Sequence, residues 1–320
     1  MFNFNLKANI IYVLIAMIID FLLGDPSWLP HPIIYIGKLI SKLESYFRKG
    51  EKSDEGLRIC GGLIVLIVCF VTYIIPYILL KLSLINIYLF HGLNIFIIWT
   101  TLAANSLHKA AIEVYKSLER KDIEDARVKL SYIVGRDTKN LEEDEIIRAD
   151  IETVAENSSD GIIAPIFYAI LGGAPLAMMY KGVNTMDSML GYLNKKYKFI
   201  GFFPAKVDDL FNLIPARLTG ILMCLTSFVV GGTIEDSFRI MIRDRKNHKS
   251  PNCAYPEAAA AGAMKIQLGG TNTYFGELVY KPTLGDRIKS LEASDIKQSI
   301  KLMYSSEILL VLISLILVIM

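Results

Sequence analysis

Long apolar stretches alternate with polar segments along this chain, and the length of each stretch decides what it predicts. A helix needs about 20 mainly apolar residues to cross a bilayer. Residues 59–80 and 84–104 meet that length, and the few residues between them leave room only for a tight hairpin. Residues 8–24 are acceptable at the short end, and because they lack a small-residue cleavage site they are typical of a retained helix. Residues 302–320 reach full length only by including Glu307, so four spans are predicted.

Two further apolar segments, 161–180 and 218–230, are ambiguous. The first carries no charge, but two prolines and the pair Gly172-Gly173 interrupt it, and the second is short for a span. Broken backbone at membrane depth is tolerated where it packs inside protein or lines a wet cavity. The sequence therefore predicts an all-α, polytopic membrane protein with about four to six transmembrane helices and a candidate re-entrant segment broken by Gly and Pro.

The distribution of Lys and Arg bears on which segments cross. The polar segments between the spans are 25–58, 105–160, 181–217 and 232–301. If both ambiguous segments cross, 26 of the 34 Lys and Arg residues fall on one side and 7 on the other, with Arg217 between them. The basic side is expected to be cytoplasmic. If only one crosses, the basic segment 232–301 lies outside the cell, against the distribution expected. Both therefore cross or neither does. We favour neither, because all the polar motifs below then face the cytoplasm.

Composition agrees with membrane spans joined by substantial polar segments. Apolar residues make up 53% of the chain and charged residues 21%. The formal net charge is only +2 and no basic run is interleaved with aromatic residues, so no nucleic-acid partner is predicted. The four cysteines form no C-x-x-C, and Cys253, alone in a polar loop, is interpreted as incidental. We expect residues 1–320 to form one membrane-embedded domain.

The segment 105–160 predicts amphipathic helices on the cytoplasmic side. Apolar residues from Ala110 to Leu118 recur at helical spacing with charges between them. The run Gly135 to Thr138 breaks this pattern, and a new helix with acidic residues in its first turn is expected from Leu141.

The most informative polar residues recur every four positions near the end of that segment. Arg148, Glu152, Glu156 and Asp160 form one stripe on a helix, and Gly161 opens the ambiguous apolar stretch. A solvated face with an Arg148–Glu152 pair is the commoner fate of such a stripe. A functional role is favoured here, because carboxylates at a membrane boundary are costly unless they are paired or bound to a cation.

Two more groups carry residues suited to phosphate or metal. Asn184 and Asp187 are three apart and share a helical face, and Lys181 precedes them. Asp208 lies next to Asp209 and four residues before Asn212, so Asp208 and Asn212 can converge. A helix cap, a lysine that extends to the membrane surface and a capped helix start are the simpler explanations.

Loop residues supply a fourth group and a single histidine. Asn252 and Glu257 lie in a Pro- and Gly-rich stretch with exposed amides, which is otherwise an ordinary loop. His31 stands between two prolines and suits a general base or a structural role equally. Walker, dinucleotide-binding, zinc-protease and serine-hydrolase motifs are all absent from the sequence. Residue types alone therefore predict a magnesium-phosphate site at a membrane face.

Taken together and in order, these segments resemble the adenosylcobinamide-phosphate synthase family of cobalamin biosynthesis, known as CbiB or CobD. The matching stretches are GDPSWLPHPIIYIGKLI at 24–40, VGRDT at 134–138, ETVAENSSDGIIAPIFYAILGGAP at 152–175, YKGVNTMDSMLGY at 180–192, DDLFNLIPARL at 208–218 and SPNCAYPEAAAAGA at 250–263. The departures are small: Lys206 stands where Arg is expected, and Ala254-Tyr255 replaces Gly-Trp, which bears on a stacking contact.

The resemblance implies an enzyme that forms an amide between a propionate of adenosylcobyric acid and (R)-1-amino-2-propanol O-phosphate or a related amino alcohol. ATP is the implied energy source and Mg²⁺ the implied cofactor. From residue type we assign catalytic roles to Glu152, Glu156, Asp187 and His31. Substrate or phosphate binding is assigned to Arg136, Lys181, Asn184, Arg217, Asn252 and Glu257. Metal binding is assigned to Asp160, Asp187, Asp208 and Asp209.

The implied partners are the corrinoid, the amino alcohol phosphate, the lipid bilayer and other membrane-bound late enzymes of the same pathway. Two alternatives stay open. A membrane sensor or transporter on the same scaffold would use the broken helix as its ion site. A membrane prenyl- or alcohol-phosphotransferase is less favoured, because such enzymes carry a second aspartate motif, and none is found in this sequence.

Overall fold

The computed structural model describes residues 5–319 except 27, 51, 193 and 275. The fold divides into two compact units, each built from separate stretches of chain. Unit 1 comprises residues 1–103 and 164–212, and unit 2 comprises residues 104–163 and 213–319. Each unit is described by itself.

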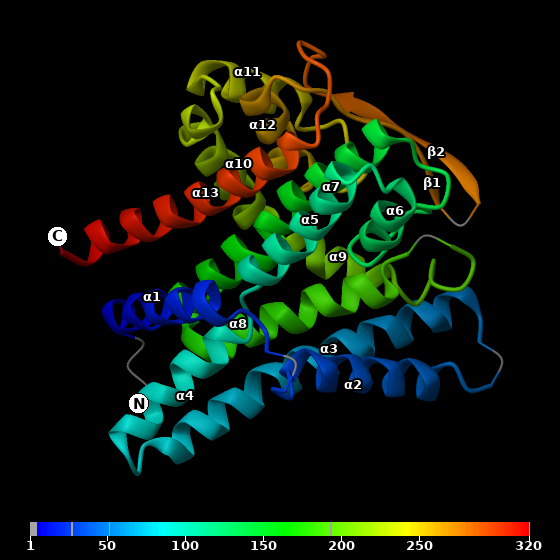
Figure 1. Ribbon diagram of the computed structural model, residues 1–320. Helices are drawn as coiled ribbons and strands as arrows, with labels where there is room; N and C mark the ends of the chain where they lie inside the picture. Colours follow the sequence, from blue (N-terminus) through cyan, green and yellow to red (C-terminus); the bar gives the residue numbers. More distant parts are fainter. Residues whose placement is uncertain (1–4, 27, 51, 193, 275, 320) are drawn as a thin grey trace. The chain divides into compact units, whose positions relative to one another are not determined.

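Unit 1 is helical and contains three of the predicted spans. Its elements are α1 (Leu6–Leu23), α2 (Pro32–Phe47), α3 (Asp54–Ser83), α4 (Ile87–Trp99), α8 (Ala164–Leu190) and α9 (Phe202–Phe211) (Figure 1). Helix α3 packs on α8, and α1 packs on α4. Large apolar side chains such as Ile18, Leu22 and Phe70 are more than half exposed. Such a surface is unfavourable in water and suits contact with lipid.

Helix α8 is interrupted where the sequence predicts a break. Gly172 and Gly173 have non-helical backbone angles, and Gly173 has a φ of 66° that side chains rarely adopt. The amide of Asn9 on α1 donates to the carbonyl oxygen of Ile170 at 3.1 Å, so a neighbouring helix satisfies backbone freed at the break.

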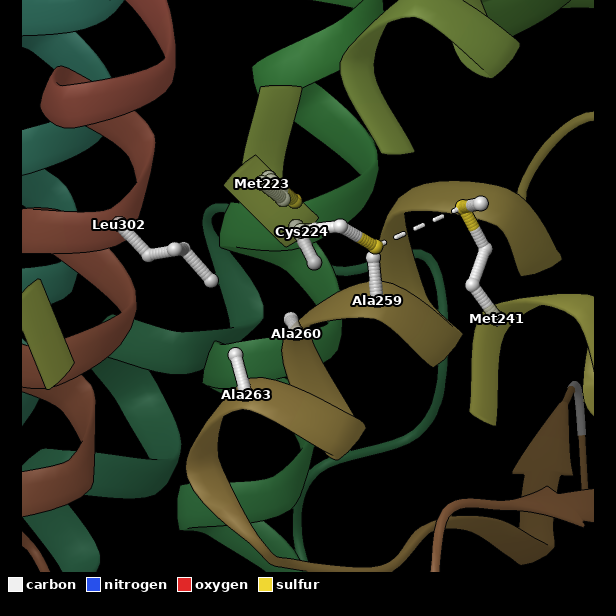
Figure 2. Packing of buried hydrophobic residues seen from close by; sticks show 8 residues of the cluster. Met223, Cys224, Met241, Ala259, Ala260, Ala263 and Leu302 are labelled. Carbon is white, nitrogen blue, oxygen red and sulfur yellow. Dashed lines mark hydrogen bonds between the residues drawn. The ribbon is translucent and has the colours of Figure 1, made fainter. Parts of the chain in front are cut away.

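Unit 2 is built around a short alanine-rich helix. Its helices are α5 (Ala104–Glu119), α6 (Ile123–Ser131), α7 (Glu143–Ser158), α10 (Leu213–Leu225), α11 (Ile234–Asp244), α12 (Ala254–Met264) and α13 (Ser294–Ile319), with a π-helical turn at Ser159–Ile163 and a 3-10 turn at Ser227–Val230. Figure 2 shows Ala259, Ala260 and Ala263 of α12 packed beside Met223, Cys224 and Leu302. The small side chains let the surrounding helices approach closely, so every residue from Pro256 to Met264 is buried.

The predicted helix start near Leu141 is confirmed. Helix α7 opens with three acidic residues, Glu143 to Glu145, and a capping box joins Glu142 to Glu145. Negative side chains are favourable at a helix N-terminus because they offset the unpaired amides there.

A β-hairpin in unit 2 was not predicted. Strands β1 (Leu268–Tyr274) and β2 (Glu277–Leu284) pair antiparallel, with an irregularity between Leu268 and Gly270. Gly269 and Gly270 have φ angles of 80° and 92°, which favour glycine. Leu268, Gly269 and Gly270 continue the Pro- and Gly-rich stretch that the sequence indicates as an ordinary loop, so no strand is expected here. The fold is otherwise all-α over the residues described.

The helices confirm a multi-pass membrane protein. Five described segments are long and apolar enough to cross a bilayer: Leu6–Leu23, Asp54–Ser83, Ile87–Glu119, Glu143–Leu190 and Ser294–Ile316. These include the four predicted spans and the first ambiguous segment. Helix α10 has 13 residues and a length of roughly 20 Å, against about 30 Å for the hydrocarbon core.

Candidate functional site

Polar side chains gather in two groups, one within each unit. In unit 1, Asp187 on α8 lies close enough to Asp208 on α9 to affect its ionisation, and we call these two residues the carboxylate pair. In unit 2, buried and half-buried charged residues from the loop before α7, from α7 itself, from α12 and from β2 form what we call the charged cluster. Its members are Arg136, Glu152, Glu156, Glu257 and Lys281.

Arg136 and Glu152 form the best-connected ion pair of the charged cluster. Arg136 Nη2 donates to Glu152 Oε2 at 2.5 Å, and Arg136 Nη1 donates to Asn272 Oδ1 at 2.6 Å. The backbone amide of Gly269 donates to Glu152 Oε1 at 2.7 Å. The side chains of Arg136 and Glu152 are only 7% and 4% exposed, so their charges depend on these partners. The predicted partner Arg148 lies 4.0 Å away, which is a weaker contact.

Glu257 is a second deeply buried carboxyl group of the cluster, besides Glu152. It lies on α12 with 3% of its surface exposed. Burial raises its pKa well above the ordinary value, and the negative charges of Glu152 and Glu156 raise it further. Lys281 and Arg136 oppose this shift without cancelling it. Glu257 is therefore a proton-holding group among charged neighbours.

Lys281 brings a second cation into the cluster from β2. Burial lowers the pKa of its amine, but Glu257, Tyr274 and Glu156 together outweigh this effect, so the net shift is upward. The ammonium is also 5.7 Å from the ring centroid of Tyr274. Lys281 therefore stays charged. The cluster contains three carboxyl groups but only two cations, so the cations cannot neutralise all three groups.

Glu156 accepts a hydrogen bond from a thiol. Cys253 Sγ donates to Glu156 Oε1 at 3.0 Å. Burial raises the pKa of the Cys253 thiol well above its ordinary value, and the charge of Glu156 adds to this effect, so the thiol keeps its proton. Cys253 thus has a hydrogen-bond partner in the charged cluster, which the sequence did not predict.

His248 lies close enough to Lys281, Glu156 and Glu152 for their charges to affect its ionisation. Burial lowers the pKa of His248, and the nearby ammonium of Lys281 lowers it further. Its Nδ1 accepts the backbone amide of Ser250 at 3.0 Å, which leaves the proton of the neutral ring on Nε2. A neutral imidazole with an N–H donor is therefore available beside the carboxylates.

Arg217 and Asn252, both predicted to bind phosphate, meet in unit 2. Arg217 Nη1 lies 3.3 Å from Asn252 Oδ1 and donates to it. The guanidinium of Arg217 lies 4.4 Å from the ring centroid of Tyr255, which is the stacking contact that the sequence suggested at this position.

The carboxylate pair of unit 1 is held by amides. Asn212 Nδ2 donates to Asp208 Oδ2 at 3.0 Å, which confirms the predicted convergence of these two residues. Burial raises the pKa of Asp208 to about 8, with the charge of Asp187 as the second cause. The side chain of Asn184 lies close enough to stabilise the ionised form of Asp208. Three of the predicted residues therefore lie together.

A tyrosine network fixes the amide that contacts Asp208. Tyr180 donates from its hydroxyl to Asn212 Oδ1 at 2.8 Å. Tyr168 stacks on Tyr180 with 5.1 Å between ring centroids and donates to the carbonyl oxygen of Phe211 at 2.7 Å. Asn212 must therefore present its amino group, not its oxygen, to the carboxylate.

Two further residues of unit 1 lie on α8 or directly after it. Lys181 is buried on α8, with 8% of its surface exposed. Gly191 follows α8, and a Cβ atom there would overlap Asp187 Oδ1. The carboxylate of Asp187 thus occupies space that only glycine leaves free.

The carboxylate pair fits a magnesium ion by its chemistry. Asp208 Oδ1 is buried without a hydrogen-bond partner, and two adjacent carboxylates repel unless a cation or proton lies between them. Among the described residues no group of three or more His, Cys, Asp or Glu side chains is arranged to hold a metal ion. Magnesium commonly takes one or two carboxylates plus substrate phosphate and water. Asp187 and Asp208 as its ligands, with Asn184 beside them, remain a prediction.

The other two predicted metal ligands are not members of the carboxylate pair, although the charge of Asp209 also raises the pKa of Asp208. Asp209 pairs with Lys206 at 3.3 Å on a partly exposed face. Asp160 lies in the π-helical turn of unit 2, where its charge raises the pKa of Cys253. The predicted metal set is therefore divided between the two units.

His31 has a structural role in unit 1. Its Nδ1 accepts the backbone amide of Ile33 at 3.2 Å and so caps α2. Its Nε2 lies 3.4 Å from Asp25 Oδ1. The two ring nitrogens thus have partners near the start of α2, which favours the structural alternative over a general base.

Sequence reasoning missed three members of the site. Lys281 and Asn272 lie on the hairpin, and His248 follows α11. No motif or helical periodicity connects them to the acidic stripe. The only indication in the sequence is Lys281, a basic residue in a mainly apolar run. This indication does not show which residues Lys281 would contact.

Comparisons with known proteins identify the family of this chain. The family model described as CobD/Cbib protein matches residues 13–303. A protein of Clostridium tetani named cobalamin biosynthesis protein CobD is 61% identical over 95% of this chain and 96% of its own length. The namesake of Clostridium acetobutylicum is 62% identical over 96% and 97% of the two chains. A Salmonella typhi protein named cobalamin biosynthesis protein CbiB is 46% identical over 91% of each. No solved structure matches. The chain belongs to the CobD/CbiB family.

Proposed function

We propose that this protein acts in cobalamin biosynthesis as an ATP-dependent synthase. It joins a propionate carboxylate of adenosylcobyric acid to the amine of aminopropanol phosphate, or of a related amino alcohol, to give adenosylcobinamide phosphate. The observation that carries the proposal is the charged cluster of unit 2, in a chain of the CobD/CbiB family. Buried carboxylates beside two cations and a neutral imidazole suit chemistry that moves a proton and neutralises phosphate charge.

The proposed reaction has two steps. A carboxylate is a poor acyl donor, so its oxygen first attacks the γ-phosphorus of ATP, forming an acyl phosphate and releasing ADP. The amine then attacks the acyl carbon, phosphate leaves with the C–O bonding pair, and the nitrogen loses a proton to a base. Arg136 and Lys281 offset the negative charge that develops in both steps.

Glu156 is the base that we assign to the second step. Its carboxylate is partly exposed and accepts from Cys253, whereas Glu152 is fully occupied by Arg136 and Gly269. Glu152 accordingly positions the guanidinium, and Glu257 stores a proton close by. The nearness of Glu257 to Glu156 supports a proton relay between them.

Magnesium would be held by Asp187 and Asp208, with Asn184 beside them. The ion would supply positive charge to a phosphate group bound within unit 1. Lys181 lies on the same helix, one turn before Asn184, and would add a cation for phosphate. In this proposal the polar segments face the cytoplasm, where ATP is present, and other membrane-bound late enzymes of the pathway are expected partners.

The direct test is turnover by the full-length protein in detergent with ATP, Mg²⁺, adenosylcobyric acid and aminopropanol phosphate. Mass spectrometry should detect the amide, and ADP should appear in equal amount. Glu156→Gln and Asp187→Asn should each lower kcat by about 100-fold or more, as expected for loss of a general base or a metal ligand. Glu235→Gln, an exposed change in the first turn of α11, is the matched control.

Absence of the amide with either the phosphorylated or the free amine would reject the synthase. Near-full activity of both variants would remove the charged cluster and the carboxylate pair from the mechanism. In the first case the alternative of a membrane sensor or transporter is favoured. One feature supports it: a cavity of about 140 Å³ in unit 1, lined by Asn9, Asn94 and the broken backbone at Gly172-Gly173.

A further inference from the structure

A large pocket in unit 2 lies outside the charged cluster but shares one residue with it. Its volume is about 780 Å³, at the upper end of the range for small-molecule sites. One wall is the loop from Arg136 to Leu141, and the other is the β-hairpin. Arg136 lines this pocket and also binds Glu152, so the pocket leads to the charged cluster.

Hydrogen bonds join the two walls, so the pocket is formed before a ligand binds. The backbone amide of Asp137 donates to the carbonyl oxygen of Thr273 at 2.9 Å. The amide of Gly276 donates in return to Asp137 Oδ2 at 2.7 Å. Asn272, on the same strand, accepts from Arg136. A ligand that enters therefore meets walls already held in place.

The lining is rich in neutral hydrogen-bonding groups and carries little net charge. Thr138, Asn140, Thr271 and Thr273 contribute hydroxyl and amide groups. Two basic and two acidic residues also line it, and most of them already have partners within the protein.

Apolar surface is present at the same place. Leu141 and Leu278 both line the pocket, and Leu278 is 78% exposed. An exposed leucine beside neutral donors and acceptors suits a ligand that has a flat apolar face and an amide-bearing edge.

We propose that this pocket binds the carboxamide-bearing edge of the corrinoid, with the reacting propionate directed toward Arg136. The inference rests on the proposed function. A corrinoid combines an apolar macrocycle with several side-chain amides, which pair with amide and hydroxyl groups such as those of Asn140 and Thr271. A nucleoside triphosphate is the less suitable occupant, because the carboxylates of Asp137 and Glu145 would oppose its phosphates.

Equilibrium dialysis without ATP tests binding apart from turnover. Asn140→Trp places a bulky ring in the pocket and should weaken adenosylcobyric acid binding by about tenfold or more, equivalent to about 1.4 kcal/mol. The KM for ATP should be unchanged. The control is Glu124→Trp on α6, whose side chain is 82% exposed and does not line the pocket.

A second measurement covers the case in which Asn140→Trp does not fold. Thr271→Cys should react with a maleimide, and adenosylcobyric acid should slow that reaction, whereas ATP with Mg²⁺ should not. Protection by ATP alone, or unchanged corrinoid affinity in folded Asn140→Trp, would overturn the assignment. If the wild type binds corrinoid but forms no amide, the proposed function fails and the pocket assignment stands.

Discussion

Asp208 is deeply buried and lies close to a second carboxylate, Asp187. Both features favour the protonated form of Asp208. Burial and Asp187 raise the pKa of Asp208 from 3.8 to about 8. Between these two values the folded protein holds a proton that the unfolded chain releases. The contribution of Asp208 to stability is therefore present below its ordinary pKa and is lost as the pH rises toward 8.

A cation at the carboxylate pair must displace that proton. We therefore expect Mg²⁺ affinity to rise with pH by up to about tenfold per unit from about pH 6 to about pH 8, and then to level off. Isothermal titration in detergent measures this. Asp208→Asn should remove the pH dependence, whereas Glu55→Gln, an exposed change on α3, should retain it. Magnesium affinity that is flat with pH in the wild type would contradict the assignment.

Arg136 should matter for stability as well as for turnover. Arg136→Ala leaves Glu152 buried without its main cation, which should lower the free energy of unfolding by about 3–5 kcal/mol. Arg136→Lys keeps the charge but cannot reach both Glu152 and Asn272, so turnover should fall with a smaller stability loss.

Thermal unfolding in detergent checks this prediction. The matched control is Arg239→Ala, which breaks an exposed pair with Asp236 and should cost less than about 1 kcal/mol. Equal losses of unfolding free energy in Arg136→Ala and Arg239→Ala would contradict the prediction. They would show that the buried pair contributes no more to stability than the exposed one.

At the scale of elements, the end of α8 depends on a glycine for the placement of Asp187. A Cβ atom at Gly191 would overlap Asp187 Oδ1, so Gly191→Ala should displace that carboxylate. We expect kcat to fall by about tenfold or more and Mg²⁺ binding to weaken, since a small displacement of a catalytic group is costly.

The control for this change lies on another helix of the same unit. Gly92 on α4 has open space where a Cβ atom would go, so Gly92→Ala should leave turnover unchanged. Steady-state kinetics on both variants make the comparison. Full activity in Gly191→Ala would show that Asp187 adjusts without loss and is not held at a required position.

The hairpin shows how an element can decide a site without being recognisable in the sequence. Strand β2 carries Lys281, and β1 carries Asn272 and the amide of Gly269, all of which contact the charged cluster or its partners. Gly269 and Gly270 supply the left-handed backbone that starts the strand. A two-stranded hairpin is only marginally stable alone, so it depends on its contacts with α7, α11 and α12.

At the scale of the whole molecule, contacts within unit 2 restrict the membrane topology. The loop before α7 is hydrogen-bonded to the hairpin through Asp137, Thr273 and Gly276. Both segments must therefore lie on the same side of the bilayer, and the chain between them must cross an even number of times. This agrees with the expectation that the two ambiguous segments both cross or both do not.

The two ends of this sequence should consequently lie on the same side. Four further crossings lie outside that stretch of chain: α1, α3, the segment Ile87–Glu119 and α13. The total number of crossings is therefore even. Reporter fusions to either end, scored for fluorescence in the cytoplasm and phosphatase activity outside it, measure this. The Lys and Arg distribution predicts that the exposed positions Lys139 and Glu277 face the cytoplasm. Ends on opposite sides of the membrane would exclude the topology.

The sequence by itself determined the class of the protein and most of its elements. Apolar length is a local property, so residues 8–24, 59–80 and 84–104 were recognisable as helices, and Gly172-Gly173 as a break. Helical spacing likewise sufficed to bring Asp208 and Asn212 together.

The tertiary structure alone decided which polar residues meet. Glu152 pairs with Arg136 and makes only a weaker contact with Arg148, although Arg148 is nearer in sequence. Lys281 lies close to Glu257 although 24 positions of sequence separate them. Buried charges are stable only beside opposite charges, which favours both arrangements. The structure also shows that His31 caps the start of α2. The packing of α12 on α7 brings the thiol of Cys253 to Glu156. Such pairings depend on contacts between distant segments, and no local pattern specifies them.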